Sequence, residues 1–274
     1  MTGPDFDNFR RLVLDRSGLV LGPEKAYLLK ARLEPIVRSE GASSIEDLLA
    51  RLRFVKNDAL LDRCVEALAT HESSFFRDGA PFEALKKTVL PELANLRAGV
   101  RRIRIWCAAC SSGQEPYSIA MVAKELGQKL SGFSVEIVAT DFAPGILSKA
   151  KAGLYTDFEV RRGLTDERLN TWFTKESGGW RIHQDLRDMV KFRQHNLLNN
   201  MDEIGAFDVV FCRNVLIYFD AETKQQVLGR IASAMAHDAW LFLGSAESLM
   251  GLPSGLTPAQ GAHGLCRRSG LFAA

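Results

Sequence analysis

Small and acidic residues follow two hydrophobic runs of the chain, where a nucleotide-like ligand would find hydrogen-bonding groups. The loop over residues 108–118 is rich in Ala, Ser and Cys and holds one glycine, Gly113. The G-x-G-x-x-G pattern of dinucleotide sites is absent, so a ligand without a pyrophosphate is favoured. Asp141 lies 28 residues after Gly113, and a carboxylate there suits the two hydroxyls of a ribose. The alternative is an N-cap for a helix that begins near Pro144.

Further polar groups occupy comparable positions. Glu115 stands at the start of an expected helix, where the helix dipole favours a negative charge even without a ligand. Asn214 and Tyr218 follow a third hydrophobic run, and Asn196 follows a shorter one. Tyr218 is also compatible with a packed aromatic ring whose hydroxyl is satisfied locally.

Arg77 directly follows two phenylalanines, Phe75 and Phe76. Paired phenylalanines are more often core than functional residues. A guanidinium beside apolar walls, however, binds a carboxylate strongly through two parallel hydrogen bonds. Arg77 is therefore a candidate for orienting an acidic substrate.

The five cysteines, at positions 64, 107, 110, 212 and 266, are an odd and scattered set. This usage is typical of reduced thiols and predicts a cytoplasmic protein. Cys107 and Cys110 form a single C-x-x-C, which suggests zinc or redox chemistry. No second C-x-x-C or C-x-x-H accompanies it, so small residues lining a turn are the favoured interpretation, and we expect no metal.

The composition indicates an ordinary globular chain with a sizeable core, since 46% of the residues are hydrophobic and 25% are charged. The net charge of +2 gives no sign of nucleic-acid binding. No apolar run approaches the roughly 20 residues of a membrane span, and the first residues lack a signal-peptide pattern.

The elements that would position the polar groups change in kind near residue 98. Residues 5–96 show apolar residues at helical spacing only. Beyond residue 100, hydrophobic runs at 103–109, 133–139, 207–212 and 239–243 alternate with helical patterns at 116–130, 144–152 and 221–236. This alternation predicts an α/β domain with a parallel sheet covered by helices on both faces. Ligands bind such sheets at the carboxyl ends of the strands.

Residues 155–195 interrupt the alternation. They contain a helical pattern near 165–173, a Ser-Gly-Gly turn at 177–179, and short strand-like runs at 180–182 and 189–192. We interpret them as an inserted small antiparallel β-subdomain. The pattern leaves open whether this insertion is decoration or a docking arm.

Taken together, these stretches resemble the CheR family, the methyltransferases that esterify glutamates of bacterial chemoreceptors with S-adenosylmethionine. The likeness spans nearly the whole chain in the right order. It rests on SSFFRD at 73–78, WCAACSSGQEPYS at 106–118, ATD at 139–141, NLL at 196–198 and FDVVFCRNVLIYFD at 207–220.

The resemblance implies an N-terminal all-helical domain (1–76), a linker helix (77–98) and a Rossmann-like S-adenosylmethionine-binding domain (99–274) with the inserted β-subdomain (155–195). It also implies the residues that contact the cofactor or its product S-adenosylhomocysteine: His71, Ser73, Arg77, Glu115, Asp141, Asn196, Leu197, Arg213 and Asn214. Arg77 and Tyr218 resemble residues proposed to act at the methyl-transfer centre.

The chain departs from the family pattern at four places. His71 stands where Asn is usual, Ser73 where Thr is usual and Gln114 where an acid is common. The family's Gly-His-Ser-Glu reads Gly-Ser-Ala-Glu at 244–247. These changes bear on cofactor affinity more than on the type of reaction.

The resemblance also implies a partner, the cytoplasmic helical region of chemoreceptors. Some family members grip a pentapeptide tether through a longer hairpin than the one expected at 173–180, so binding without a tether is expected here. Residues 25–56 carry a net charge of +3, which by itself fits a solvated face as well as a surface that attracts an acidic receptor helix. The resemblance favours the docking surface. The basic members are Lys25, Lys30, Arg32, Arg38, Arg51, Arg53 and Lys56.

Three other functions remain open on these residues. A methyltransferase acting on a different substrate would use the same cofactor residues. A module that binds the cofactor without catalysis would explain the changes at His71 and Ala246. A nicotinamide dehydrogenase is the least favoured, since the glycine fingerprint is missing.

Overall fold

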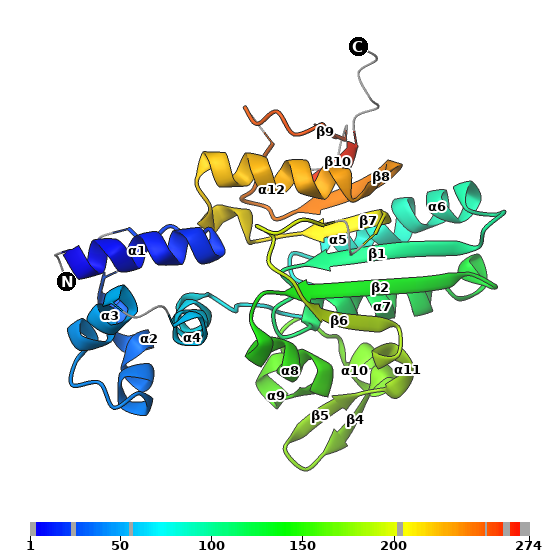
Figure 1. Ribbon diagram of the computed structural model, residues 1–274. Helices are drawn as coiled ribbons and strands as arrows, with labels where there is room; N and C mark the ends of the chain where they lie inside the picture. Colours follow the sequence, from blue (N-terminus) through cyan, green and yellow to red (C-terminus); the bar gives the residue numbers. More distant parts are fainter. Residues whose placement is uncertain are drawn as a thin grey trace. The chain divides into compact units, whose positions relative to one another are not determined.

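The computed structural model describes residues 4–22, 26–54, 57–201, 205–249, 251–259 and 264–268. They form two compact units (Figure 1). One comprises the chain up to Thr70 together with Tyr218–Lys224, and the other comprises His71–Ile217 and the chain from Gln225 onward. The sequence predicted a domain boundary at residue 76, whereas the structure groups residues 71–76 with the second unit. Within the described residues, no helix is long and apolar enough to cross a membrane.

The first unit is helical, as predicted. Its helices are α1 (Pro4–Ser17), α2 (Ala26–Ser39), α3 (Ile45–Phe54) and α4 (Asp58–Leu68). Each helix buries one apolar stripe, for example Phe6, Phe9 and Val13 on α1. This spacing of three to four residues is what an amphipathic helix requires. Asn57 caps α4, because its side-chain oxygen accepts from the amide of Leu60 at 3.0 Å.

The second unit is built on a seven-stranded sheet with the order β6-β2-β1-β7-β8-β10-β9. The strands are β1 (Arg102–Ala108), β2 (Ser134–Asp141), β6 (Val190–Gln194), β7 (Phe207–Cys212), β8 (Met235–Leu243), β9 (Leu256–Pro258) and β10 (Leu265–Arg268). β6, β2, β1, β7 and β8 are parallel, whereas β10 and β9 are antiparallel additions at one edge. The sheet is therefore mixed, and the sequence had predicted neither β9 nor β10.

The helices of this unit connect and cover the strands (Figure 1). They are α5 (Ala80–Ala84), α6 (Leu90–Leu96), α7 (Gln114–Glu125), α8 (Pro144–Ala152), α9 (Asp157–Arg161), α10 (Asp166–Trp172), α11 (Gln184–Arg187) and α12 (Ala221–Ser233), the last belonging to this unit from Gln225 onward. A π-helical turn (Leu85–Val89) joins α5 to α6. Short 3₁₀ turns lie at Gly127–Leu130 and Leu216–Tyr218.

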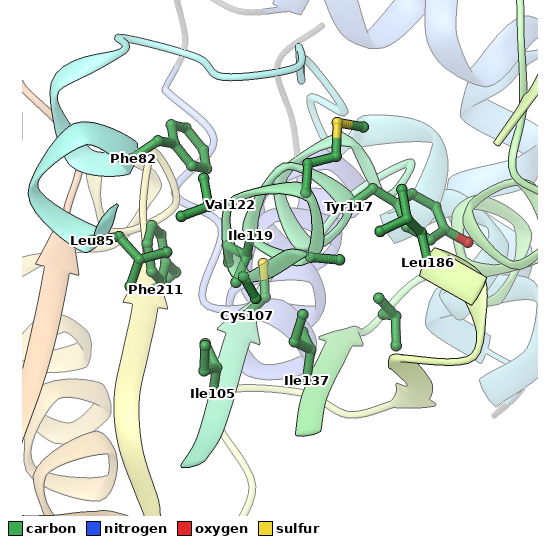
Figure 2. Packing of buried hydrophobic residues seen from close by; sticks show 14 of the residues in the cluster. Phe82, Leu85, Ile105, Cys107, Tyr117, Ile119, Val122, Ile137, Leu186 and Phe211 are labelled. Atoms are coloured by element: carbon green, nitrogen blue, oxygen red, sulfur yellow. The ribbon is translucent and has the colours of Figure 1, made fainter. Parts of the chain in front are cut away.

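The predicted linker helix over 77–98 is three pieces, α5, the π-turn and α6, that pack into the core of the second unit. Figure 2 shows Phe82 and Leu85 beside Phe211 of β7. It also shows Cys107 of β1 beneath Ile119 of α7. These side chains are at most 2% exposed. This segment is thus part of the sheet's covering layer.

A buried ion cluster fixes the end of α6. Arg97 lies 2.8 Å from Asp208 of β7 and 2.6 Å from Asp238 of β8. The second oxygen of Asp208 accepts from the amide of Arg104 at 2.8 Å. The cluster therefore ties the covering layer to two strands and to the backbone of β1.

The inserted subdomain has the predicted antiparallel sheet, but only the run at 180–182 was predicted as one of its strands. Its three-stranded antiparallel sheet consists of β3 (Leu154–Tyr155), β5 (Gly179–Ile182) and β4 (Phe173–Glu176), in that order. The run at 189–192 belongs instead to β6 of the large sheet, where it pairs parallel to β2. The predicted fold class, an all-helical domain plus an α/β methyltransferase-type domain with a small antiparallel sheet, is confirmed.

Candidate active site

The carboxyl ends of β1, β2, β6 and β7 meet at one edge of the large sheet, as parallel strands must (Figure 1). The chain turns from β1 to β2 on one side, while β7 pairs with β1 on the other, which makes this edge a topological switch point. Six predicted residues follow these strands: Glu115, Asp141, Asn196, Leu197, Arg213 and Asn214. The structure thus brings them to one edge.

The backbone at this edge is held in uncommon conformations. Among the described non-glycine residues with positive φ, all but Arg101 lie here: Phe76, Asp78, Ala109, Ser111 and Asn214. Such conformations cost energy and persist where surrounding contacts fix them. Gly113 has φ of 93°, and an added Cβ would lie 3.0 Å from Ala150 and from the hydroxyl of Tyr155. The single glycine of the loop is therefore required by both backbone and space.

Asp141 fastens the first loop to the second. Its side chain accepts from the amide of Ser111 at 2.8 Å and from that of Ala143 at 3.1 Å. It is only 5% exposed. Helix α8 begins at Pro144 with Ala143 at its N-cap position, so the alternative role of Asp141 as that N-cap is not observed. The carboxylate therefore stands at the strand end where the ribose interpretation expects it, and the ribose role stays a prediction.

Arg213 is the buried centre of an ion network. Its side chain is 1% exposed and donates to Glu115 at 2.7 Å and to Asp78 at 2.6 Å. It also donates to the carbonyl of Arg77 at 2.9 Å. Sequence reasoning missed Asp78, although it lies next to Arg77. Two carboxylates offset the cost of burying one guanidinium, and the network joins β7, α7 and the turn after Arg77.

The C-x-x-C pair takes part in this network through one thiol. Cys107 donates to Glu115 at 3.0 Å. Burial, reinforced by Glu115, raises the pKa of the Cys107 thiol well above its usual value, so the group keeps the proton that it donates. All five cysteines are buried free thiols. The described residues hold no group of three or more His, Cys, Asp or Glu side chains arranged for a metal ion.

The segment at 71–77 joins the edge from outside the sheet. The carbonyl of His71 accepts from the hydroxyl of Ser111 at 3.3 Å. One nitrogen of the Arg77 guanidinium donates to the carbonyl of Glu72 at 2.9 Å, and Ser73 is half-buried. His71 and Arg77 thus contact strand-end residues through their backbone carbonyls, and Ser73 lies on the segment between them.

Glu247 is a site residue that the sequence analysis noted only as part of a motif. It is 5% exposed, and its two oxygens accept from four backbone amides. The amides are those of Asn214 at 2.9 Å, Gly244 at 2.6 Å, Val215 at 2.9 Å and Leu216 at 2.7 Å. Glu247 therefore shapes the loop after β7 and holds Asn214 at φ of 59°. An acid three residues after Gly244, the glycine that follows β8, is its only local signal.

The loop after β6 is held in a similar way. The carbonyl of Asp141 accepts from the amide of His195 at 3.0 Å. The side chain of Asn196 accepts from the amide of Leu198 at 3.0 Å, and Leu197 is buried. This loop is therefore ordered beside the end of β2.

Tyr218 belongs to the stretch that groups with the helical unit. Its carbonyl accepts from the amide of Val20 at 3.1 Å, and the residue is half-buried. Its expected role beside Arg77 stays a prediction.

The residues at the strand ends fit a small polar ligand that lacks a pyrophosphate. Small residues line the turn after β1, and a buried carboxylate follows β2. Within the described part of the chain, Nε of Arg213 and Nε2 of His71 are buried without a hydrogen-bond partner. Buried polar atoms of this kind call for a partner, and a bound cofactor with amino-acid and ribose groups offers both donors and acceptors.

The basic residues of the helical unit differ in availability. Arg32 donates to the carbonyls of Leu68 and Ala69 at 2.5 and 2.9 Å, so it caps the end of α4. Arg51 and Arg53 form ion pairs with Asp47 and Asp5 at 2.8 and 2.9 Å. Lys30 is exposed, and Arg38 pairs with Glu34 at 2.9 Å while its side chain stays 77% exposed. Lys25 and Lys56 lie outside the described residues.

Comparison with known proteins gives matches over both units. The family model "CheR methyltransferase, SAM binding domain" matches residues 71–264, and "CheR methyltransferase, all-alpha domain" matches residues 4–69. Chemotaxis protein methyltransferase 1 of Pseudomonas aeruginosa is 43% identical over 271 residues, which are 97% of each chain. Chemotaxis protein methyltransferase Cher2 of Pseudomonas putida is 42% identical over 255 residues, covering 91% of this chain and 92% of the relative. Chemotaxis protein methyltransferase of Listeria monocytogenes is 34% identical, covering 90% of each chain.

Proposed function

Because the chain belongs to the CheR methyltransferase family, S-adenosylmethionine-dependent enzymes of chemotaxis, we propose that it esterifies glutamate side chains of bacterial chemoreceptors. The observation that carries this proposal is that the expected cofactor residues and Arg77 meet at the carboxyl edge of the large sheet. The buried Asp141 ends β2, and the ion network of Arg213 with Glu115 and Asp78 follows β7. Arg77 is fastened to that network through its own carbonyl.

The cofactor is held by the strand-end residues. Asp141 binds the ribose hydroxyls, as its burial and position at the end of β2 support. Glu115, Arg213 and Asn214, which follow β1 and β7, are further cofactor contacts. His71 and Ser73, from the segment before α5, with Asn196 and Leu197, complete the contacts.

The chemistry needs orientation more than proton transfer. Bound S-adenosylmethionine supplies a methyl group that is already activated on a sulfonium. A glutamate carboxylate has a reference pKa of about 4.3 and is ionised at neutral pH, so no general base is required. The protein must strip water from the carboxylate and aim one oxygen.

Arg77 orients that acceptor carboxylate. Among the described residues, the hydrogen bond from its side chain goes to the carbonyl of Glu72, and a guanidinium has five N–H donors. The acceptor loses its charge as the ester forms, so tight pairing would stabilise the substrate more than the transition state. Tyr218 adds a hydroxyl beside the reacting carboxylate, and neither residue transfers a proton.

The helical unit meets the acidic receptor helix through Lys30 and Arg38. Both are exposed, whereas Arg32 caps α4 and is unsuitable for a charge-reversal test. Lys30→Glu together with Arg38→Glu should slow receptor methylation at least fivefold at low salt, and the difference should shrink at high salt. Arg11→Glu together with Lys129→Glu, at exposed positions outside this surface, is the control with the same change in charge. Equal rates for the two proteins at low salt would exclude this surface.

Receptor binding does not depend on a C-terminal tether. The strands β4 and β5 are joined by the two residues Ser177 and Gly178, since Glu176 pairs with Gly179. Such a hairpin is as short as hairpins commonly become. Receptors with and without their last five residues should therefore be methylated at equal rates.

The deciding experiment transfers labelled methyl from S-adenosylmethionine to membranes that carry the organism's own chemoreceptors. Receptor-borne label that alkali releases as methanol is expected, because glutamyl methyl esters hydrolyse in base. Absence of label, in a preparation that still binds S-adenosylhomocysteine, would refute the proposal and favour a cofactor-binding module or another substrate.

A further inference from the structure

The inserted subdomain packs directly on the segment that carries Arg77. Phe75 is fully buried. Its ring meets the edge of Tyr155 at 5.0 Å and that of Phe173 at 5.5 Å between centroids. Aromatic rings prefer such edge-to-face contacts. The two partner rings come from β3 and β4, so the insertion forms the walls of the Phe75 pocket.

The two backbones also touch. Gly163, between α9 and α10, has φ of 109°, and an added Cβ would lie 1.9 Å from the carbonyl oxygen of Phe75. No other residue fits at such a distance from a backbone atom. The close approach leaves the Phe75 carbonyl little freedom to shift toward the insertion.

Arg168 of α10 packs against Phe76, the residue after Phe75. Its guanidinium carbon lies 3.8 Å from the centre of the Phe76 ring. Two of its nitrogens donate to Glu125 at 2.7 and 3.0 Å. A bidentate pair fixes the plane of a guanidinium, so the stack on Phe76 is held from the side of α7.

Phe76 needs such support because its backbone lies in the left-handed region, at φ of 50°. Its amide donates to the hydroxyl of Ser118 at 3.0 Å, and its carbonyl accepts from the amide of Gly79 at 2.9 Å. A non-glycine residue in this region relaxes when its surroundings do not hold it. The direction in which Arg77 leaves the chain follows from that conformation.

We propose that Arg168 is a positioning residue for methyl transfer, which acts through Phe76 to hold Arg77 toward the acceptor carboxylate. In this view, the inserted subdomain supports the segment that carries Arg77. This inference rests on the proposed role of Arg77 in orienting the acceptor. A partner that displaces α10 would change the position of Arg77 through the same contacts.

The test compares Arg168→Ala with Arg181→Ala. Arg181 lies in the same insertion and pairs with Glu176 at 2.8 Å and with the carbonyl of Ala152 at 2.6 Å, away from Phe76. The readouts are hydrogen–deuterium exchange of residues 72–79, and kcat and KM for the receptor. Arg168→Ala should speed exchange there at least fivefold and lower kcat about five- to fiftyfold, with KM changed less than twofold, since small misplacements cost up to about 100-fold.

Arg168→Lys separates orientation from stability. Lysine can pair with Glu125 but has no planar group to stack on Phe76. This variant should keep the melting temperature of the parent while kcat stays reduced. If Arg168→Ala and Arg168→Lys match Arg181→Ala in exchange or in kcat, the inference is overturned.

Arg77→Ala distinguishes the two proposals. If Arg77→Ala keeps the parent kcat, the proposed role of Arg77 fails, and the inference fails with it. If Arg77→Ala loses activity while the Arg168 variants behave as Arg181→Ala does, only the inference fails.

Discussion

Replacement of Glu247 by glutamine tests whether one buried carboxylate builds the loop after β7. Each of its oxygens accepts from two backbone amides. Glutamine has one carbonyl oxygen, and its NH₂ group only donates. Whichever way the amide turns, two of the four N–H groups lose their acceptor and face another donor.

The expected loss follows from that count. A buried donor without a partner costs about 1–3 kcal/mol, so two of them cost about 2–6 kcal/mol before the loop relaxes. We expect a loss of about 2–4 kcal/mol in the free energy of unfolding of the second unit. Asn214 would then leave its left-handed conformation. We expect the variant protein to bind S-adenosylhomocysteine about tenfold more weakly, which corresponds to about 1.4 kcal/mol.

The assay can be confined to the right unit. All four tryptophans, at 106, 172, 180 and 240, lie in the second unit, so their fluorescence during urea unfolding reports on it. Isothermal calorimetry gives the affinity for S-adenosylhomocysteine. Glu167→Gln, at an exposed position of α10, is the control for the same chemical change. A Glu247→Gln protein within 0.5 kcal/mol of that control would refute the reasoning.

Three further predictions concern other parts of the second unit. Arg77→Lys should lower kcat for receptor methylation about tenfold or more, because lysine cannot hold a carboxylate through two parallel bonds; full turnover would exclude bidentate orientation. Asp141→Asn should weaken S-adenosylhomocysteine binding by about 1–3 kcal/mol, which calorimetry measures; unchanged affinity would remove the ribose role. The hydrogen bond from Arg102 lowers the pKa of Glu136 to about 2 in the folded protein. The ionised Glu136 therefore stabilises the fold fully above its pKa in the unfolded chain, about 4.5, and this stabilisation is lost as the pH falls toward 2. Urea unfolding should show that Glu136→Gln costs about 1–2 kcal/mol at pH 7 and little at pH 2; an equal cost at both would contradict the assignment.

The central strands could be predicted because their sequence reflects complete burial. All six residues of β7 are buried, and a buried parallel strand reads as a continuous hydrophobic run. β6 was placed wrongly for the opposite reason. It lies at the edge of the sheet, and only Val190 is buried, so its local pattern does not say which strand it joins.

The site residues at the strand ends could be predicted from the sequence, whereas the hydrogen bonds between side chains and distant backbone groups could not. Asp141 and Arg213 follow hydrophobic runs, which the sequence displays. The partners of Glu247 and Arg32 are backbone groups, and a backbone amide or carbonyl leaves no mark in the sequence. A charge count therefore included Arg32 in a docking surface although it caps a helix.

The buried thiols make the native chain a ready background for single-site labelling. Cys64, Cys107, Cys110, Cys212 and Cys266 are all covered, and burial raises the pKa of each, to about 12 for Cys64 and about 11 for Cys266. Maleimides attack thiolates, which are scarce at pH 7 when the pKa is so high. A cysteine introduced on the exposed face of α2 or in the β4–β5 hairpin would then be the one reactive thiol. Dyes and spin labels could follow receptor docking without removal of any native cysteine.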